Sequence, residues 1–128
     1  MKMTRHKECI GRNRLDQSQV NDWKEVQQPY FIFGVEDGQE MLDKQPEKAE
    51  VFIKKQERFC LTGDEGIALC IHSDVLSWNH LGIYCITSCY GNTGVLCIEL
   101  CSGKPELVWK FKTAKEQYYG SASCKHRW

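Results

Sequence analysis

The chain has 128 residues, with 17 basic and 17 acidic side chains and a formal net charge of zero. This length predicts a single domain whose core is large enough to need no covalent support. We expect no nucleic-acid partner, because such proteins gain affinity largely by neutralising phosphates and are usually basic. The longest apolar runs are shorter than the ~20 residues of a membrane-spanning helix. No secretory signal is recognisable, so the expected compartment is the cytoplasm, where thiols stay reduced.

The first 28 residues are polar and predict a tail or a short helix, and residues 29–128 predict one β domain. Residues 29–38 are typical of a first strand, and residues 39–50 of a charged loop or a single helical turn. Six further short strands are expected, at residues 51–61, 67–71, 75–78, 83–90, 95–101 and 107–111. A turn at 63–66 separates the first two of them. Residues 114–128 favour a helix interrupted by Gly120, with Ser121 as the cap of a last helical segment.

Eight cysteines are present, and most of them lie in apolar runs of period two. The glycine-bounded turn between two of these runs places Cys85 opposite Leu100 in a hairpin. Alternation then puts Cys85 and Cys89 on one face of the sheet and Cys97 and Cys101 on the other. Four ligands split in this way cannot form one tetrahedral zinc site. We therefore interpret the cysteines as buried, reduced side chains and expect no metal ion.

Two other classes of protein remain open on these residues. One is a metal-binding or redox-active Cys/His protein, and the other is a secreted domain held together by disulfides. A catalytic thiolate would need a nearby base, and the Cys70/His72 and Cys124/His126 pairs offer one. Neither pair lies in a recognisable nucleophile motif. We expect no enzyme, no catalytic residue and no cofactor.

A small basic group, formed by Lys54, Lys55 and Arg58, lies in the charged run at 51–61. These residues are the candidates for binding a phosphoinositide headgroup, which makes a lipid membrane a second partner class. An edge strand protected by lysines predicts the same residues, and we favour that interpretation of them.

Seven short antiparallel strands followed by one C-terminal helix form a β sandwich whose open end the helix covers. This order resembles the pleckstrin-homology-like superfold, which includes phosphotyrosine-binding (PTB) domains and the third lobe of FERM domains. Four short motifs are similar to that third lobe: Phe33-Gly-Val-Glu-Asp37, Leu61-Thr-Gly-Asp-Glu-Gly-Ile-Ala-Leu69, Trp78-Asn-His-Leu-Gly-Ile83 and Cys124-Lys-His-Arg-Trp128.

The resemblance implies an adaptor or scaffold module that binds a protein segment and performs no chemistry. In this superfold a peptide adds as an extra strand and packs against the C-terminal helix. Carried onto this chain, that groove lies between the strand at 83–90 and the helix at 122–128. The implied peptide-binding residues are Ile83, Tyr84, Ile86, Ser88, Tyr90, Lys125 and Trp128.

Overall fold

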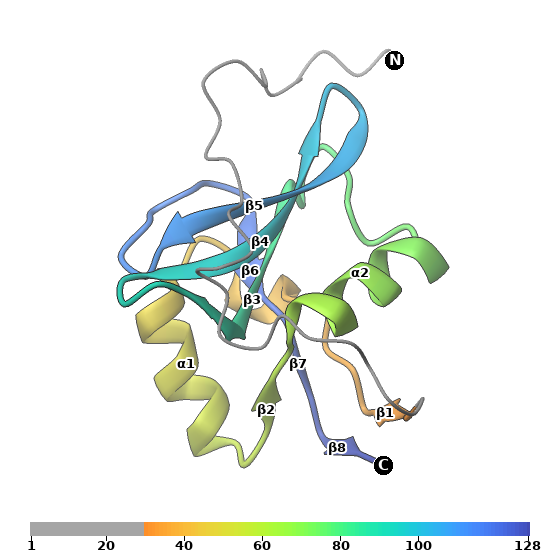
Figure 1. The fold of residues 1–128 in the computed structure, drawn as a ribbon, viewed down its shortest axis with the longest axis vertical. Coiled ribbons are helices and arrows are strands. Elements are labelled where there is room, and N and C mark those ends of the chain that lie inside the picture. The colour runs from red at the N-terminus through yellow and green to blue at the C-terminus, as the bar shows by residue number, and fades with distance from the viewer. Residues whose placement is uncertain (1–29) are drawn as a thin grey trace.

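A computed structural model describes residues 30–128, so the tail or short helix expected over residues 1–28 lies outside the described residues. In this part of the chain a four-stranded sheet has a helix on each of its faces (Figure 1). The elements, in chain order, are β1 (Ile32–Phe33), η2 (Gln39–Met41), α1 (Pro46–Lys55), β2 (Phe59–Cys60), α2 (Gly63–His72), β3 (Gly82–Tyr90), β4 (Gly94–Cys101), β5 (Lys104–Phe111), β6 (Tyr119–Ser121), β7 (Ser123–Cys124) and β8 (His126–Arg127).

The main sheet has the strand order β5-β4-β3-β6. Its first three strands form an antiparallel meander, and β6 then pairs with β3 in parallel. Two small antiparallel sheets, β1-β8 and β2-β7, each pair a strand from the first half of the described chain with a strand near its C-terminal end. The prediction of a mainly β domain rich in antiparallel pairing is confirmed. The described strands number eight and form three sheets, so the predicted single seven-stranded sandwich or barrel is not what the structure contains.

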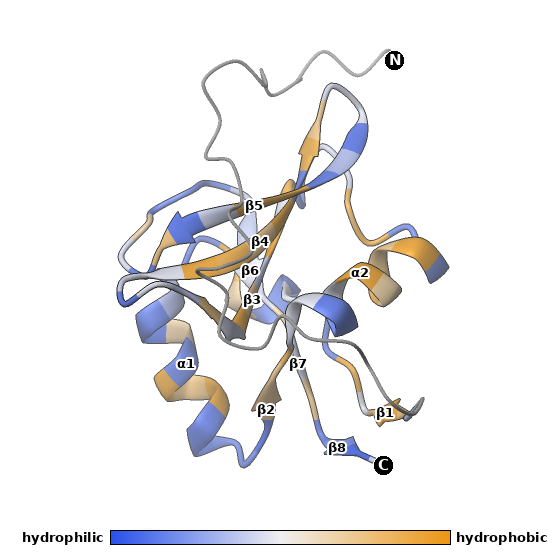
Figure 2. Ribbon diagram, in the orientation of Figure 1, coloured by the Kyte–Doolittle hydropathy of each residue, from blue (hydrophilic) through white to orange (hydrophobic). Residues whose placement is uncertain are grey.

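Alternation along β3 and β4 divides the core into two layers. Ile83 and Cys85 face α2, where they pack with Leu96 and Ile98. Tyr84, Ile86 and Cys97 face the opposite way and pack with Ala49 and Ile53 of α1. Apolar residues accordingly dominate the centre of the sheet, whereas the polar residues of α2 lie in its first turn and at its last residue (Figure 2).

The predicted faces of Cys85 and Cys97 are confirmed, but the predicted register is wrong. Cys85 pairs with Leu96 instead of Leu100, and Cys89 pairs with Val95. An irregularity between Cys85 and Cys89 places extra residues on β3. Such a bulge leaves residues of one strand without a partner on the next and cannot be located by alternation alone.

Helix α1 occupies residues 46–50 of the segment predicted as a loop or a single helical turn (39–50) and about half of the extended run predicted at 51–61. Pro46 begins the helix, where its missing N–H is not needed. Glu47 lies in the first turn, and Lys54 and Lys55 lie in the last, which suits the helix dipole. Ala49 and Ile53, four residues apart, form the buried stripe. The sequence carried these helix signals, and the period-two interpretation overlooked them.

Helix α2 replaces the turn predicted at 63–66 and the strand predicted at 67–71. A reciprocal capping box begins it: the Glu65 N–H donates to Thr62 Oγ1 at 3.2 Å, and the Thr62 N–H donates to Glu65 Oε1 at 2.8 Å. Such a box satisfies two of the backbone donors that a helix start leaves unpaired. Both Gly63 and Gly66 lie within the helix. Glycine is needed at these two positions, because larger side chains there would overlap Leu96 and Cys85.

The predicted strand at 75–78 is absent, and only an isolated bridge joins Ser77 to His80. The predicted C-terminal helix is also wrong, because residues 119–127 form β6, β7 and β8. Each of these strands finds a separate partner, namely β3, β2 and β1. Tertiary pairing therefore overrides the local helix preference of this segment. No described helix has the length and apolar character needed to cross a membrane.

Candidate functional site

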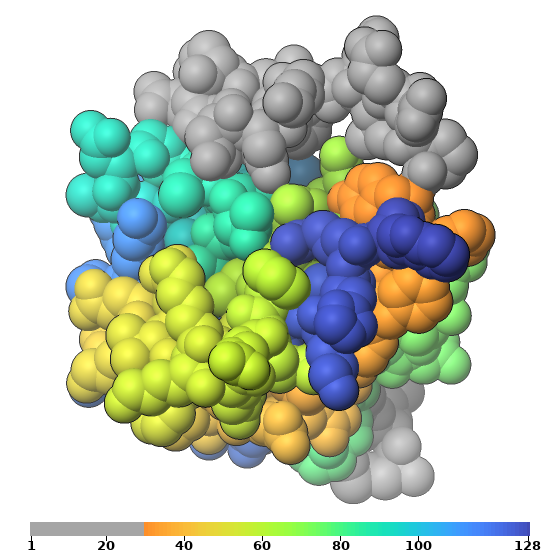
Figure 3. Space-filling model, turned by 90° about the horizontal axis from the view of Figure 1, so that it is seen from below, coloured from red at the N-terminus to blue at the C-terminus, as the bar shows by residue number. Residues whose placement is uncertain are grey.

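A pocket of about 530 Å³ opens between α1, β2 and β8. Seen from below, α1, the segment at 56–60, the C-terminal strands and β1 lie next to one another on this face of the molecule (Figure 3). The residues that line the pocket are Glu50, Lys54, Glu57, Arg58, Phe59, Cys60, Thr87 and Arg127. Two of the three predicted lipid-binding residues, Lys54 and Arg58, are among them.

Arg127 is held on this pocket by a network that reaches α2. Its Nε and Nη2 atoms donate to the two carboxylate oxygens of Glu65 at 2.6 and 2.9 Å. Nη2 also donates to the Cys60 carbonyl at 2.7 Å, and the guanidinium lies 5.6 Å from the centre of the Phe59 ring. Tyr30 donates a further hydrogen bond to Glu65 at 2.9 Å. The position of this cation is therefore fixed by groups of two separate segments, β2 and the start of α2, and Tyr30 holds the carboxylate that binds it.

The Glu65 carboxylate is ionised in this network although it is buried. Burial alone raises its pKa, but the hydrogen bonds from Arg127 and from the Thr62 N–H, together with the charge of Arg127, lower it below its ordinary value. The same ion pair raises the pKa of Arg127. A bidentate pair between guanidinium and carboxylate has the geometry that makes such contacts strong.

Arg58 is fixed in a different way. Its Nε donates to Ser123 Oγ at 2.9 Å, and its Nη2 donates to the carbonyl oxygens of Gly34 and Ser123. Within residues 30–128 no carboxylate lies within ion-pair distance of Arg58. Its positive charge is therefore solvated by neutral backbone and hydroxyl oxygens, and it remains available to an anion.

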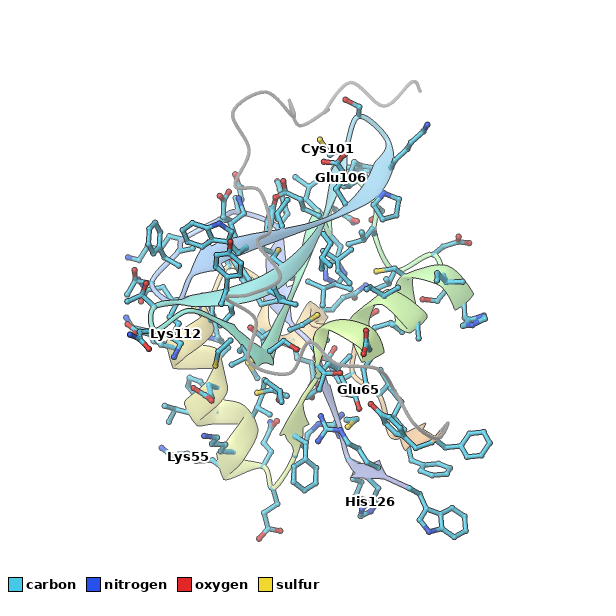
Figure 4. All side chains as sticks on the ribbon, in the orientation of Figure 1. Lys55, Glu65, Cys101, Glu106, Lys112 and His126 are labelled. Atoms are coloured by element: carbon cyan, nitrogen blue, oxygen red, sulfur yellow. The ribbon has the colours of Figure 1, made fainter. Side chains whose placement is uncertain are left out.

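Lys54 and Lys55 extend the positive charge along the last turn of α1. The Lys54 ammonium lies 3.3 Å from the Glu50 carboxylate one turn earlier, in an exposed pair. Such surface pairs contribute little to stability. Lys55 lies at the same lower end of the molecule as His126, whereas Cys101 and Glu106 lie at the opposite end (Figure 4).

An aromatic strip runs along the outer face of the β1–β8 pair. Phe31, Phe33 and Trp128 are 70%, 44% and 84% exposed, and neighbouring ring centres along the strip are 6.4 and 6.3 Å apart. Main-chain hydrogen bonds between Phe31 and Trp128 in both directions fix the pairing at 2.7 Å. Exposed apolar rings that adjoin one another are typical of interaction sites.

The strip and the pocket are contiguous. Gly34 accepts the hydrogen bond from Arg58 and lies directly against the Lys125 side chain, and Gly34 follows Phe33 of the strip. We call the whole the basic–aromatic surface. Its residues are Phe31, Phe33, Lys54, Lys55, Arg58, Phe59, Lys125, Arg127 and Trp128.

The predicted peptide groove does not form. Ile83, Tyr84, Ile86 and Ser88 are buried in the core between the two helices, and Tyr90 is partly buried in a stack with Trp109, whose ring centre lies 5.1 Å away. The helix that would complete the groove is absent from the C-terminal segment. The two remaining predicted residues, Lys125 and Trp128, instead join the predicted lipid-binding residues on the basic–aromatic surface.

Four of the thiols in the described part of the chain are poorly suited to nucleophilic chemistry. Burial and the nearby Glu50 carboxylate raise the pKa of Cys60 to about 11, and burial raises that of Cys70 to about 11. Burial also raises the pKa values of Cys97 and Cys124. A protonated thiol is a weak nucleophile and a weak metal ligand.

The two cysteine-based alternatives, a metal-binding or redox-active protein and a domain held together by disulfides, have little support from the arrangement of cysteines in residues 30–128. Six of the cysteines in this range form no disulfide: Cys60, Cys70, Cys85, Cys89, Cys97 and Cys124. Cys101 is disulfide-bonded, so the expectation that all eight are reduced is wrong at this position. No group of three or more metal-ligating side chains comes together in the part of the chain that the structure describes.

A second pocket, of about 480 Å³, lies between the segment after β1 and the end of α2. Its wall includes Glu36 and Asp37. Burial and a hydrogen bond with Asp37 raise the pKa of Glu36, and the N–H groups of Gly38 and Glu40 donate to its carboxylate. These backbone bonds give the carboxylate a structural role in the turn before η2.

Several residues of the basic–aromatic surface were not predicted as site residues from the sequence. Phe31 and Phe33 alternate in the run predicted as a first strand, so their common outer face could have been noticed. Arg127 gave no such signal, because its role depends on Glu65 and on a strand where a helix was expected.

The family model described as Family of unknown function (DUF5701) matches residues 1–128. The chain belongs to this family. No curated protein and no solved structure matched it.

Proposed function

We propose that the protein is a non-enzymatic interaction module that binds an acidic segment of a partner protein on the basic–aromatic surface. The observation that carries this proposal is Arg58: an immobilised guanidinium that has no carboxylate partner within the described residues, in a pocket next to exposed rings. A segment that carries carboxylates and apolar side chains complements both parts of this surface.

The arrangement of positive and negative charges in the pocket favours binding of a protein segment over binding of a membrane. Glu50 and Glu57 line the pocket together with Lys54, Arg58 and Arg127, so positive and negative groups alternate over a short distance. A uniformly anionic lipid surface meets repulsion from the two glutamates, whereas a segment with spaced charges avoids them. A phosphoinositide membrane, suggested by Lys54, Lys55 and Arg58, is the competing partner that the experiment must separate.

The likeness to pleckstrin-homology-like domains is not needed for this proposal, because the peptide is placed on a different surface. The cytoplasm remains the proposed compartment. Six of the described cysteines form no disulfide, which supports a reducing environment, whereas the disulfide at Cys101 is the observation that argues against it. The raised thiol pKa values support the proposed absence of catalysis.

The test is an array of labelled peptides that differ in acidic and aromatic content, read by fluorescence anisotropy. We expect affinity to rise with acidic content and to rise further when phenylalanine is present. Lys54→Glu combined with Lys55→Glu should weaken the acidic peptides by about tenfold or more. Lys104→Glu, at an exposed position at the start of β5, is the matched control and should change little.

Vesicles of phosphatidylcholine, with and without phosphatidylserine or a phosphoinositide, form the second arm. Binding to anionic vesicles without binding to any peptide would replace the proposal with a membrane function. Peptide affinities that do not depend on acidic content, or no peptide binding at all, would also contradict it.

A further inference from the structure

We infer that the pocket between Arg58 and Arg127 holds a phosphate monoester, carried as a phosphoserine or phosphothreonine by the bound segment. This inference rests on the proposed function and specifies the chemical group that the pocket recognises. It starts from Arg58, directly before β2, and Arg127 in β8, which line one pocket and are each held by several protein oxygens.

Both guanidiniums are fixed through the same pair of nitrogens. In Arg58 and in Arg127 the Nε and Nη2 atoms donate to the protein itself. The Nη1 atom of each makes no hydrogen bond to another residue in the range 30–128. Each arginine therefore presents one pair of N–H donors from a position that is already fixed. A ligand that uses them loses little side-chain entropy on binding.

The charge of the pocket suits a dianion better than a single carboxylate. Glu65 offsets much of the charge of Arg127, whereas Arg58 has no such partner. Lys54 is paired only through an exposed contact with Glu50. A phosphate carries close to two negative charges at neutral pH and can use Arg58 while drawing Lys54 away from Glu50.

The residues that line the pocket determine where the phosphate of the ligand lies and where its carbon atoms lie. The Phe59 ring, which packs beneath the Arg127 guanidinium, gives an apolar surface for the side-chain carbon atoms of a phosphoserine. Thr87 Oγ1 already donates to the Cys60 carbonyl at 2.6 Å. Recognition of the phosphate therefore falls to the cations. The volume of about 530 Å³ leaves room for residues that flank the phosphate.

The thiol in the pocket lining is not suited to attack a bound phosphate group. This thiol, Cys60, is buried and has a pKa of about 11. A cysteine-dependent phosphatase needs a thiolate near neutral pH. The phosphorylated segment should therefore be recovered unchanged after incubation with the protein.

The test uses three peptides of the same acidic and aromatic sequence, with serine, phosphoserine or glutamate at one central position. We expect the phosphoserine peptide to bind about tenfold more tightly than the serine peptide. The glutamate peptide should bind with an affinity between those of the serine and phosphoserine peptides, because it adds a single planar charge. Inorganic phosphate, at constant ionic strength, should compete with the phosphoserine peptide.

Arg58 also ties Gly34 and Ser123 together, so its substitution affects folding as well as binding. Glu50→Gln avoids this difficulty, because it removes an exposed carboxylate and releases Lys54. It should strengthen phosphoserine binding by about three- to tenfold, and it should strengthen the serine peptide, which is acidic but lacks the dianion, by a smaller factor. Glu106→Gln, at the other end of the molecule, is the matched control.

The outcomes separate the two proposals. Equal binding of the serine and phosphoserine peptides refutes the phosphate site and leaves the acidic-segment function intact. An unchanged phosphoserine affinity in Glu50→Gln also counts against the site. If neither peptide binds, the proposed function itself fails.

Discussion

The guanidinium of Arg127 and the carboxylate of Glu65 form a bidentate ion pair at 2.6 and 2.9 Å, although they lie 62 residues apart. Through this pair β8 is tied to the first turn of α2, whose capping box uses the same carboxylate. Tyr30 donates to Glu65 as well. One buried carboxylate thus connects both ends of the described chain to the helix that covers one face of the sheet.

Arg127→Met should destabilise the protein by roughly 3–5 kcal/mol, because Glu65 would be left as a buried charge without its partner. Lysine at position 127 should recover only part of this loss, because it cannot form the bidentate contact. Urea denaturation followed by circular dichroism measures both effects. A loss below ~1 kcal/mol in Arg127→Met would show that the pair contributes no more than an ordinary surface contact.

The double variant Arg127→Met/Glu65→Gln separates the contribution of the Arg127–Glu65 ion pair to stability from that of the Thr62–Glu65 capping box. Glutamine keeps an oxygen for the Thr62 N–H but carries no charge, so the double variant should be more stable than Arg127→Met alone. Additive losses in this cycle would mean that the two side chains do not interact in solution.

Acidification should destabilise the protein through His80. This residue is 1% exposed, neither of its ring nitrogens has a partner among the described residues, and burial lowers its pKa below 6.5. The unfolded chain therefore takes up a proton at a higher pH than the folded protein does. Stability is greatest above about pH 6.5 and falls below it, by at most about 1.4 kcal/mol per pH unit.

Urea denaturation between about pH 7 and pH 5.5 measures this slope, above the range in which carboxylates dominate. His80→Leu should remove most of it, and His126→Gln, at an exposed histidine, should leave it in place. A wild-type slope that persists in His80→Leu would assign the pH dependence to other groups.

A second loss of stability is expected at lower pH, through Glu65. Its pKa is lowered in the folded protein, so its contribution is complete above the pKa of the unfolded chain, near 4.5. It disappears as the pH falls through the lower, folded pKa. In Glu65→Gln this acid limb should shrink, which denaturation below about pH 4.5 can measure.

Gly66→Ala should destabilise the protein, because a Cβ atom there would overlap Cys85 Sγ on the facing strand. Cys85→Ala should restore part of the stability, since it removes the overlapping atom. Gly120→Ala is the contrasting case, because its Cβ would meet the Gly38 carbonyl and no side chain can be shortened to relieve it. Thermal unfolding of the single and double variants tests this; a Cys85→Ala change that fails to help Gly66→Ala would contradict the packing of α2 on β3.

Cys60 and Cys97 should react slowly with iodoacetamide in the folded protein, because burial raises the pKa of both thiols. Both should react readily in urea, and Cys101 should be labelled only after reduction. Mass spectrometry of peptides from timed reactions gives the rate at each position. Rapid labelling of Cys60 in the native protein would point to an activated thiol beside the pocket and reopen the redox alternative.

The strands at 82–90, 94–101 and 104–111 were predictable from the sequence because each pairs with its neighbour in the chain. For such neighbouring strands, the alternation of apolar and polar side chains and the short turn between the strands largely determine how the strands pair. The two helices were predictable in principle, since Pro46 and the Thr62–Glu65 capping box are local signals. They were missed because apolar residues in a short run fit either a period of two or a period near 3.6.

The sequence by itself determined the local features of this protein: the hairpins, the helix caps, the two faces of β3 and β4, and the positive charge of Lys54, Lys55 and Arg58. Only the tertiary structure decided the fate of the C-terminal segment, because β6, β7 and β8 pair with strands far away in the chain. It also placed Arg58 and Arg127 on one pocket beside Phe33 and Trp128. Long-range pairing is fixed by the packing of the whole core, and no pattern within 15 residues of the chain encodes it.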